Sequence, residues 1–321
     1  MPLRVVAVVV THNRRDLLAE ALTAVEAQTR PPDHVVVVDN ASTDGTADLM
    51  GTRSRAAAMP VELIRLRRNS GGAGGFAVGL CRALELAADA IWLLDDDAVA
   101  TPGALEALVA AHDDAVVVAS RVLWTDGADH PMNTPRSRPS PHPGRARIRS
   151  ASFVSVLVDA AAVRERGLPV ADYFLWNDDF EFTARLLRGR SGLLCRDSVV
   201  VHKTRSREFD PTARFFYEVR NKIWLFTRSP CLAPGERLLY AGSTLRRWIV
   251  AFARSRRRAE LCGELARGLW AGIRTRPRPT EEILRDLRPP GVSPCRRPVS
   301  ARPRRRPWGW RRSGAVRRLG R

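Results

Sequence analysis

An uninterrupted apolar run that ends in three carboxylates constrains this chain more than any other feature. Residues 91–94 are Ile, Trp, Leu and Leu, and Asp95, Asp96 and Asp97 follow directly. Because a strand without polar alternation is buried on both faces, the run predicts an inner strand of a parallel sheet, and ligands bind at the carboxyl ends of such strands. Three adjacent acids repel one another there unless a cation neutralises them, so we expect a metal site. The alternative is a solvated acidic turn before a helix near Pro102.

Strand-like and helix-like segments alternate along the first hundred residues. Runs rich in Val, Ile and Leu are separated by segments whose apolar residues recur at helical spacing. Such alternation is typical of βαβ units, so we expect an α/β fold with a mostly parallel sheet flanked by helices. The expected strands are 5–10, 35–38, 61–66, 91–94, 151–158 and 199–201, and the expected helices are 16–28, 46–50, 76–88 and 178–187.

The rest of the chain contains three segments of different character. Residues 131–149 are rich in Pro, Arg and Ser without periodicity, so we expect a mobile loop. Residues 214–273 follow a helical pattern, with an amphipathic segment around 245–253. From residue 275 onward too few apolar residues remain to form a core, so we expect disorder.

The positive charge is concentrated in the last segment. The formal net charge is +19, and residues 275–321 carry 15 Arg against three acidic residues, which leaves +12. The first two hundred residues therefore have the charge balance of an ordinary globular enzyme. No apolar run approaches the roughly 18 residues that a spanning helix requires, and the start of the chain lacks the apolar stretch of a signal peptide. We therefore expect a cytoplasmic protein.

Polar residues follow each of the first four strands, where one ligand could touch them all. Thr11 and Asn13 follow the first strand, and Asp39 follows the second. The third strand precedes a glycine-rich loop, residues 67–75, whose glycines permit close backbone approach and whose following helix favours phosphate at its N-terminus. Residues 95–97 follow the fourth strand. The order of the four features is a stronger signal than any one of them.

Two common phosphate-binding motifs do not fit this loop. Residues 71–75 lack the Gly-Lys-Ser/Thr of a Walker A loop. A dinucleotide fingerprint follows the first strand of its sheet, whereas this loop follows the third, and the acids come too late to bind a ribose. None of the five cysteines lies in a C-x-x-C pair, so nothing signals a zinc site of that type.

Asp178 and Asp179 stand at the expected start of a helix in the second half of the chain. The partial positive charge of a helix N-terminus favours ionised carboxylates. An ionised carboxylate can take a proton from an acceptor hydroxyl, as a general base must. The alternative is that both residues cap the helix, while Glu181 and Arg185 form a pair within it.

The order of these motifs resembles the inverting glycosyltransferases of family 2, which have the GT-A fold. In that family the acids after the fourth strand form a D-x-D metal site, which Asp95 and Asp97 match. The resemblance therefore implies Mn²⁺ or Mg²⁺ as the cofactor. Several members of the family place a histidine after a short strand as the third ligand, which here is His202, although a lone histidine is more often structural.

The resemblance also implies roles for the remaining candidates. Asp179 would be the catalytic base, and Asp178 would assist the acceptor contact. Trp176 would be a platform for the acceptor sugar, although an aromatic residue beside a helix start belongs to the core just as often. Asp39 and Thr11 would hold the nucleoside, and Arg68 with the loop amides the diphosphate. The complete set of expected donor-binding residues is Thr11, Asn13, Asp39, Arg68, Asn69, Gly71, Gly72 and Asp96.

Within the family, the motifs at residues 69–76, 176–182 and 216–221 look most like those of galactofuranosyltransferases of actinobacterial cell-wall assembly. The resemblance implies inverting transfer of galactofuranose from UDP-galactofuranose to a hydroxyl of a polyprenyl-linked cell-envelope glycan. A rhamnosyltransferase that uses dTDP-rhamnose is the alternative. The expected domains are a catalytic domain over 1–213, with a nucleotide-sugar-binding half (1–100) and an acceptor half (101–213), a helical region at the membrane surface (214–274) and a disordered basic tail (275–321).

The tail has no counterpart in the resemblance. Its run 302–312 combines arginines with two tryptophans, which suits an anionic membrane surface, nucleic-acid phosphate or a merely solvated tail. We favour the membrane, because a lipid-linked acceptor is presented there, and expect a peripheral protein on the inner face of the plasma membrane. A nucleic acid is not expected as a partner. The rivals are a nucleic-acid-binding protein and a nucleotidyltransferase, which would release pyrophosphate instead of a nucleoside diphosphate.

Overall fold

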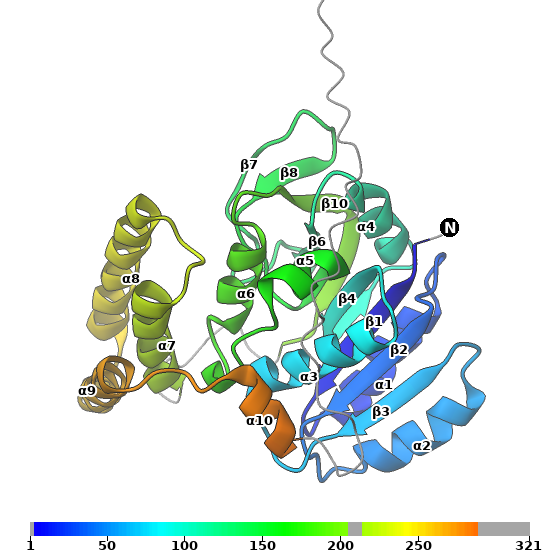
Figure 1. The fold of residues 1–321 in the computed structure, drawn as a ribbon, viewed down its shortest axis with the longest axis horizontal. Helices are drawn as coiled ribbons and strands as arrows, with labels where there is room; N and C mark the ends of the chain where they lie inside the picture. Colours follow the sequence, from blue (N-terminus) through cyan, green and yellow to red (C-terminus); the bar gives the residue numbers. More distant parts are fainter. Residues whose placement is uncertain (1–2, 205–213, 288–321) are drawn as a thin grey trace, which may run out of the picture.

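The computed structural model describes residues 3–204 and 214–287, through which one ten-stranded sheet runs (Figure 1). The strands are β1 (Val5–Thr11), β2 (His34–Asp39), β3 (Val61–Arg65), β4 (Ala90–Asp95), β5 (Ala98–Ala100), β6 (Val117–Leu123), β7 (Ser137–Pro139), β8 (Arg145–Ile148), β9 (Ser155–Asp159) and β10 (Gly192–His202). Their order is β3-β2-β1-β4-β9-β6-β10-β8-β7, and β5 pairs with β10. The strands from β1 to β4 pair in parallel, as the sequence predicts. Beyond them, β9 is antiparallel to both of its neighbours.

Helices cover both faces of the parallel strands. The helices of this part are α1 (Arg15–Glu26), α2 (Thr46–Ala56), α3 (Gly71–Glu85), α4 (Ala104–His112), α5 (Ala160–Arg166) and α6 (Asp178–Leu186), with a 3₁₀ turn, η1 (Ala171–Tyr173). Along β1, Val6 and Val8 belong to the core on the α3 side, whereas Val5 and Val9 belong to the core on the α1 side. All four side chains are fully buried, which confirms that the uninterrupted apolar runs are inner strands.

Three helices, α7 (Phe215–Arg228), α8 (Pro234–Arg254) and α9 (Arg258–Arg274), stand beside α6 (left in Figure 1) and confirm the helical pattern predicted there. Helices α7 and α9 pack closely, because Cβ atoms added at Gly268 and Gly272 would lie 2.7 Å from the Cβ atoms of Val219 and Ile223. Among the described helices, none combines the length and the apolar composition needed to cross a membrane.

Two segments expected to lack regular structure form it. Within residues 131–149, β7 and β8 make an antiparallel hairpin that pairs with β10. Residues 280–287 form a helix, α10 (Thr280–Leu287), so the prediction of disorder is wrong for residues 275–287. The buried residues of α10, Ile283, Leu284 and Leu287, join the core on the α3 side. Residues 288–321, including the tryptophan-containing run of the tail, lie outside the described part of the chain.

Leu287→Ala should destabilise the protein, because Leu287 is fully buried against α3 beside Gly74. Truncating a buried leucine typically lowers the free energy of unfolding by about 2–5 kcal/mol. Urea denaturation measures this loss. Glu282→Ala, on the exposed side of the same helix, is the matched control and should change the free energy by less than about 0.5 kcal/mol. Equal stability of the two variants would mean that α10 contributes nothing to the core.

Candidate active site

A cavity of about 1220 Å³ opens over the carboxyl ends of β1 and β4. Its wall also includes the start of α3, residues 131–136, the start of α6 and parts of α7 and α8. This is the edge of a parallel sheet at which ligands bind. The candidate residues that line the cavity are Thr11, Asn69, Gly71, Gly72, Asp95, Asp96, Asp97, Trp176, Asp178, Asp179 and His202. The other three candidates, Asn13, Asp39 and Arg68, are not among its lining residues.

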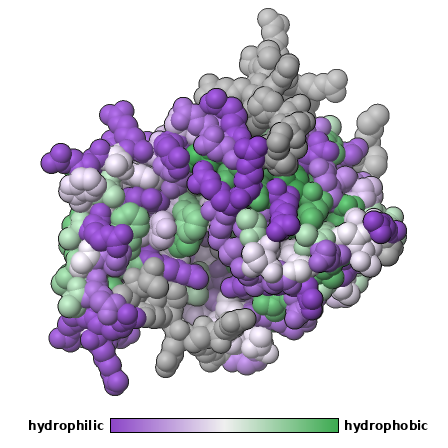
Figure 2. All heavy atoms as spheres, turned by 90° about the horizontal axis from the view of Figure 1, so that it is seen from below, coloured by the Kyte–Doolittle hydropathy of each residue, from purple (hydrophilic) through white to green (hydrophobic). Residues whose placement is uncertain are grey.

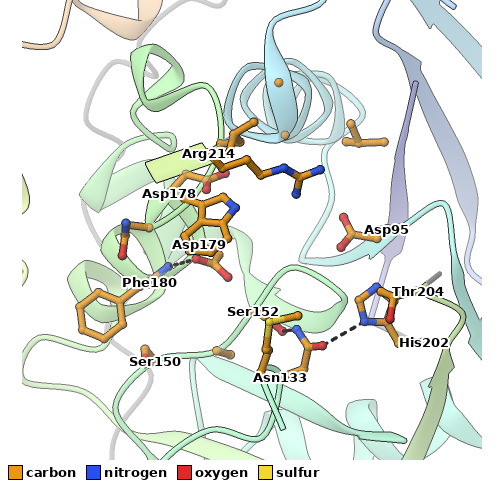
Figure 3. A pocket seen from close by; sticks show the side chains of 18 of the residues that line it. Asp95, Asn133, Ser150, Ser152, Asp178, Asp179, Phe180, His202, Thr204 and Arg214 are labelled. Atoms are coloured by element: carbon orange, nitrogen blue, oxygen red, sulfur yellow. Dashed lines mark hydrogen bonds between the residues drawn. The ribbon is translucent and has the colours of Figure 1, made fainter. Parts of the chain in front are cut away.

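Three candidate metal ligands meet at one end of this cavity. One ligand atom from each of Asp95, Asp97 and His202 lies within 4.8 Å of the other two, and His202 Nε2 is 2.9 Å from Asp97 Oδ1. The short strand β5 starts right after Asp97 and pairs with the end of β10, where His202 lies opposite Ala98. On the far side of the imidazole, Nδ1 lies 2.9 Å from Asn133 Oδ1 (Figure 3). With Nδ1–H donating to this oxygen, the protonated ring donates Nε2–H to Asp97, and a bound cation would take the place of that proton at Nε2.

Burial and repulsion give the three adjacent acids different affinities for protons. Burial raises the pKa of Asp95 to about 7, and the charge of Asp97 adds to this effect. Burial also raises the pKa of Asp96 to about 6, against the charge of Arg14. Burial acts on Asp97 in the same direction, but His202 and Arg14 outweigh it and lower the pKa of Asp97. Two carboxylates and an imidazole fit a divalent cation such as Mn²⁺ or Mg²⁺, which would relieve the repulsion.

Arg14 is a cation of this cluster that the sequence analysis did not single out. Its guanidinium contacts Asp97 and lies 3.2 Å from Asp96 Oδ1. The other oxygen of Asp96 accepts a hydrogen bond from Thr11 Oγ1 at 2.8 Å. Asp96 is therefore tied to β1 and the turn that follows it, and is not one of the three clustered ligands. An arginine that follows a strand end by three residues carries no recognisable signal in a single sequence.

The predicted nucleoside-binding residues are only partly exposed to the cavity. Asp39 is fully buried. Its Oδ1 accepts a hydrogen bond of 2.8 Å from a backbone N–H of the turn that follows β2, and its Oδ2 lies 3.5 Å from Arg65 Nε. The side chain of Asn13 accepts another N–H of that turn at 2.7 Å. Both residues thus hold the turn in place. Their chain neighbours His12 and Asn40 line the cavity instead.

The glycines of the predicted loop belong to the start of α3, because the helix begins at Gly71 and only residues 67–70 of the loop precede it. Gly71 has a φ of +68°, and an added Cβ would lie 1.9 Å from the carbonyl oxygen of Phe174. Gly71 and Gly72 thus present backbone to the cavity almost without side-chain atoms, as a diphosphate at a helix N-terminus requires. Arg68, expected at the diphosphate, is exposed and lies outside the cavity wall.

Asp178 and Asp179 stand at the start of α6, across the cavity from Asp95 and His202 (Figure 3). Burial raises the pKa of Asp178 well above its usual range, and the charge of Asp179 raises it further. Burial also raises the pKa of Asp179, but the Phe180 N–H, which donates to Asp179 Oδ1 at 2.6 Å, and the charge of Lys222 oppose the rise. The environment therefore favours ionisation of Asp179 over Asp178.

The segment before α6 has an unusual backbone that a distant side chain holds. Three of residues 174–177 have positive φ, between 64° and 71°. Asn221 of α7 is fully buried, and its Nδ2 lies 3.0, 2.9 and 2.8 Å from the carbonyl oxygens of Tyr173, Leu175 and Trp176. These contacts fix the turn that carries Trp176 into the cavity wall and sets the start of α6.

Sequence comparison assigns the family of the chain. Residues 6–166 match the model of "Glycosyl transferase family 2". The chain belongs to this family. Galactofuranosyltransferase GlfT1 of Mycobacterium tuberculosis is 34% identical over 310 residues, which cover 85% of this chain and 94% of the relative. GlfT1 of Mycolicibacterium smegmatis is 34% identical over 276 residues, which cover 75% of this chain and 87% of the relative. The predicted resemblance is thus confirmed.

Solved structures support the predicted fold of this family 2 member. S. aureus TarS 1–349 in complex with UDP has a TM-score of 0.58 at 18% identity, covering 79% of this chain and 73% of TarS. The mannosyltransferase PcManGT from Pyrobaculum calidifontis, in complex with GDP-Man and Mn²⁺, has a TM-score of 0.53 at 17% identity, covering 83% and 87%. At these identities the likeness establishes the GT-A fold alone. Family membership decides for a glycosyltransferase over a nucleotidyltransferase.

Gly71→Ala should destabilise the protein, because alanine would combine an unfavourable positive φ with a collision against the backbone of Phe174. An alanine held in the left-handed region of φ and ψ, together with an overpacked contact, should lower the free energy of unfolding by about 2–5 kcal/mol. Urea denaturation measures this loss. Gly72→Ala is the matched control, because its Cβ would meet only Asp178 Oδ2 at 3.8 Å, and it should change stability by less than about 1 kcal/mol. Equal midpoints for both variants would contradict the close approach of α3 to Phe174.

Proposed function

We propose that the protein is a metal-dependent, inverting galactofuranosyltransferase. It would move galactofuranose from UDP-galactofuranose to a hydroxyl of a lipid-linked cell-envelope glycan. The supporting observation is that the Asp95–Asp97–His202 group and the Asp178–Asp179 pair line one cavity, in a chain 34% identical to GlfT1 along most of both lengths. A metal site and a base on opposite sides of one cavity are what displacement of a nucleoside diphosphate by a hydroxyl requires.

The donor occupies the sheet end of the cavity in this proposal. Thr11, His12 and Asn40 line the part next to β1 and β2, where the nucleoside would lie, and Asp39 and Asn13 hold the turn that shapes it. The diphosphate would lie between the first turn of α3 and the acids after β4. UDP is the nucleotide of the TarS complex, and the PcManGT complex contains GDP-Man with Mn²⁺.

Asp95, Asp97 and His202 would hold Mn²⁺ or Mg²⁺, because two hard carboxylate oxygens and one imidazole nitrogen converge there. When bound, the cation acts as a Lewis acid that stabilises the charge of the leaving diphosphate. Asn133 would keep the imidazole of His202 in the orientation that presents Nε2. Arg14 would balance the remaining charge of Asp96.

Asp179 would act as the base that takes the proton from the acceptor hydroxyl as that hydroxyl attacks the sugar. The Phe180 N–H and Lys222 favour its ionised form, whereas burial and Asp179 keep a proton on Asp178. Two neighbouring acids whose pKa values are pushed apart in this way can take different roles. Protonated Asp178 would donate a hydrogen bond to the acceptor, and Trp176 would pack on the acceptor sugar from the adjacent wall.

Attachment to an anionic membrane surface fits the outer side of the helical region. Figure 2 shows apolar residues among charged ones on the side formed by α8 and α9 (left). Trp248 and Phe252 of the amphipathic segment 245–253 pack inward on Phe215, with ring centroids 5.9 and 5.8 Å from that of Phe215. The residues of α8 that are between 58% and 78% exposed are Leu238, Leu239, Leu245 and Ile249. Arginines of the same helix would contact anionic lipid.

Calorimetric titration tests the donor and the metal together. UDP should bind in the presence of Mn²⁺ and lose most of its affinity when a chelator removes the metal, and it should bind more tightly than dTDP.

Asp97→Ala should abolish the metal-dependent part of UDP binding, because Asp97 carries one of the three clustered ligand atoms. Asp96→Asn should retain direct Mn²⁺ binding, followed by electron paramagnetic resonance, because Asp96 is tied to Thr11. Equal UDP binding with Mn²⁺ and chelator would contradict the metal site, and a preference for dTDP would favour rhamnose.

Asp179→Asn should lower kcat by about 10²- to 10⁴-fold, the usual contribution of a general base, while leaving the Kd of UDP unchanged. Because burial raises the pKa of Asp179, the wild-type base is lost as the pH falls through a value above the ordinary aspartate pKa of about 3.9. When kcat/KM is plotted against pH, the midpoint of its acidic limb should therefore lie above the ordinary aspartate pKa. Steady-state assays of UDP release measure both quantities. Turnover near the wild-type level would mean that another group is the base.

A further inference from the structure

The cavity continues past the base, and its far end is cationic. Beyond Asp179 its wall contains side chains from residues 131–149, α7 and α8. The basic residues of this part are Arg136, Arg149, Lys222 and Arg247, against one acid of α7, Glu218. The sheet end of the same cavity contains the acids that follow β4. The two ends therefore select ligand groups of different kinds.

Lys222 is the unusual member of this set. Its side chain is 5% exposed, yet it lines the cavity, and its ammonium makes no ion pair or hydrogen bond with any described residue. Its only direct partners there are the rings of Phe180 and Phe226, at 5.1 and 6.0 Å from Nζ. Glu218, one turn earlier on α7, binds Asn177 Nδ2 at 2.7 Å instead. Asp179 and Glu218 are the acids whose charge acts on this ammonium, but neither forms an ion pair or hydrogen bond with it. Its N–H groups are therefore left to bind an anion in the cavity, and a buried donor without a partner is costly.

Arg247 of α8 is the second cation available to a ligand. It is exposed, lines the cavity and makes one long hydrogen bond, 3.4 Å to Thr244 Oγ1. Burial lowers the pKa of Lys222, and the charge of Arg247 lowers it further, whereas Glu218 and Asp179 oppose the shift. The two cations are therefore close enough to interact. By contrast, Arg149 is fully occupied, because it binds both carboxylate oxygens of Glu236 and two backbone carbonyls. Arg149 is therefore structural.

Aromatic rings lie beside these cations. Phe180 and Tyr240 meet edge to face with centroids 5.2 Å apart, and the guanidinium of Arg136 lies 5.8 Å from the centre of Tyr240. Lys222 lies over the other ring of the pair. A wall of alternating rings and cations suits a ligand with sugar rings and an acidic group.

The inverting geometry assigns this end of the cavity to the acceptor. In an inverting displacement the attacking hydroxyl and the leaving group lie on opposite faces of the sugar. The leaving diphosphate belongs with the acids after β4, so the acceptor enters from the side of α7 and α8. We propose that Lys222 and Arg247 form a subsite for the phosphate or diphosphate that joins the acceptor glycan to its lipid. This inference rests on the proposed function for its direction, but the anion site can be tested without it.

The same helix joins this subsite to the outer surface. Arg247 and Tyr240 of α8 line the cavity, whereas Leu238, Leu245 and Ile249 of α8 are exposed. One side of α8 thus borders the cavity with a ring and a cation, and exposed apolar residues of the same helix would contact the lipid of an acceptor with an acidic linkage between glycan and lipid.

The decisive experiment titrates geranyl diphosphate, a water-soluble lipid diphosphate, into full-length protein saturated with UDP and Mn²⁺. The wild type should bind it alongside UDP, and Arg247→Gln and Lys222→Met should each raise its Kd at least about 10-fold, as loss of a charge-assisted contact predicts. Arg246→Gln is the matched control, because Arg246 is the exposed neighbour of Arg247 and does not line the cavity. Its Kd should stay within about twofold of wild type. Geraniol should bind all four proteins equally weakly.

Three results would overturn the subsite. These are displacement of UDP by geranyl diphosphate, an equal loss of affinity in Arg246→Gln and Arg247→Gln, and unchanged affinity in Arg247→Gln. Retained UDP affinity in each variant shows that it is folded, and Arg247→Gln decides the matter if Lys222→Met does not fold. Failure of the proposed function would give a different pattern. The protein would then transfer no sugar from UDP-galactofuranose to lipid-linked acceptors, while the binding of geranyl diphosphate would still depend on Arg247.

Discussion

Repulsion among the acids after β4 is the constraint on which the site depends. Burial leaves Asp95 with a pKa of about 7 and Asp96 with one of about 6, so the cluster is unfavourable unless cations and donors reach it. Within the chain these come from separate segments: Arg14 follows β1, and His202 ends β10. Because no local segment supplies this compensation, the cluster is stable only when the whole sheet is assembled in its observed order.

The short strand β5 is the element that makes this assembly possible. It starts one residue after Asp97 and pairs antiparallel with the end of β10, which brings His202 opposite Ala98. Parallel pairing of β10 with β6 fixes the other edge of β10. A histidine more than one hundred residues away is thereby held 2.9 Å from Asp97. A three-residue strand has almost no periodicity, so this contact could not be derived from spacing and came only from the family resemblance.

The parts of the fold that the sequence predicts are those whose physical cause is local. Apolar runs such as 5–10 and 91–94 become inner strands because burial on both faces excludes polar residues, and strand-end residues converge because parallel strands end at one edge. The helix α10 was missed because the proline- and arginine-rich composition of its surroundings hides three apolar residues, Ile283, Leu284 and Leu287, on one face. The β7–β8 hairpin was missed for a similar reason, since all three residues of β7 are exposed.

The acceptor side of the site was the least predictable part. Asn133, Asn221 and Lys222 act through tertiary contacts. Asn133 and Lys222 carry no signal in their own segments, and Asn221 ends the motif 216–221, whose resemblance implied no role for it. Asn221 shows why: its single amide group bridges three carbonyls of a strained turn that lies some 45 residues earlier in the chain. A pattern search along one sequence detects residues that share a segment, whereas this wall is built from residues that share only a place in space.

The opposite character of the two cavity ends explains how one site can accept two acidic substrates. Without local compensation, two diphosphates in one cavity would repel each other, and the repulsion grows as water is excluded and the effective dielectric falls. A cation bound by Asp95, Asp97 and His202 would offset the charge of the donor, and Lys222 with Arg247 would offset that of the acceptor. In the proposed function, Asp179 would lie between the two diphosphates and contact neither, so that its charge would serve proton transfer. The separation of charges along the cavity would therefore let both substrates bind at once.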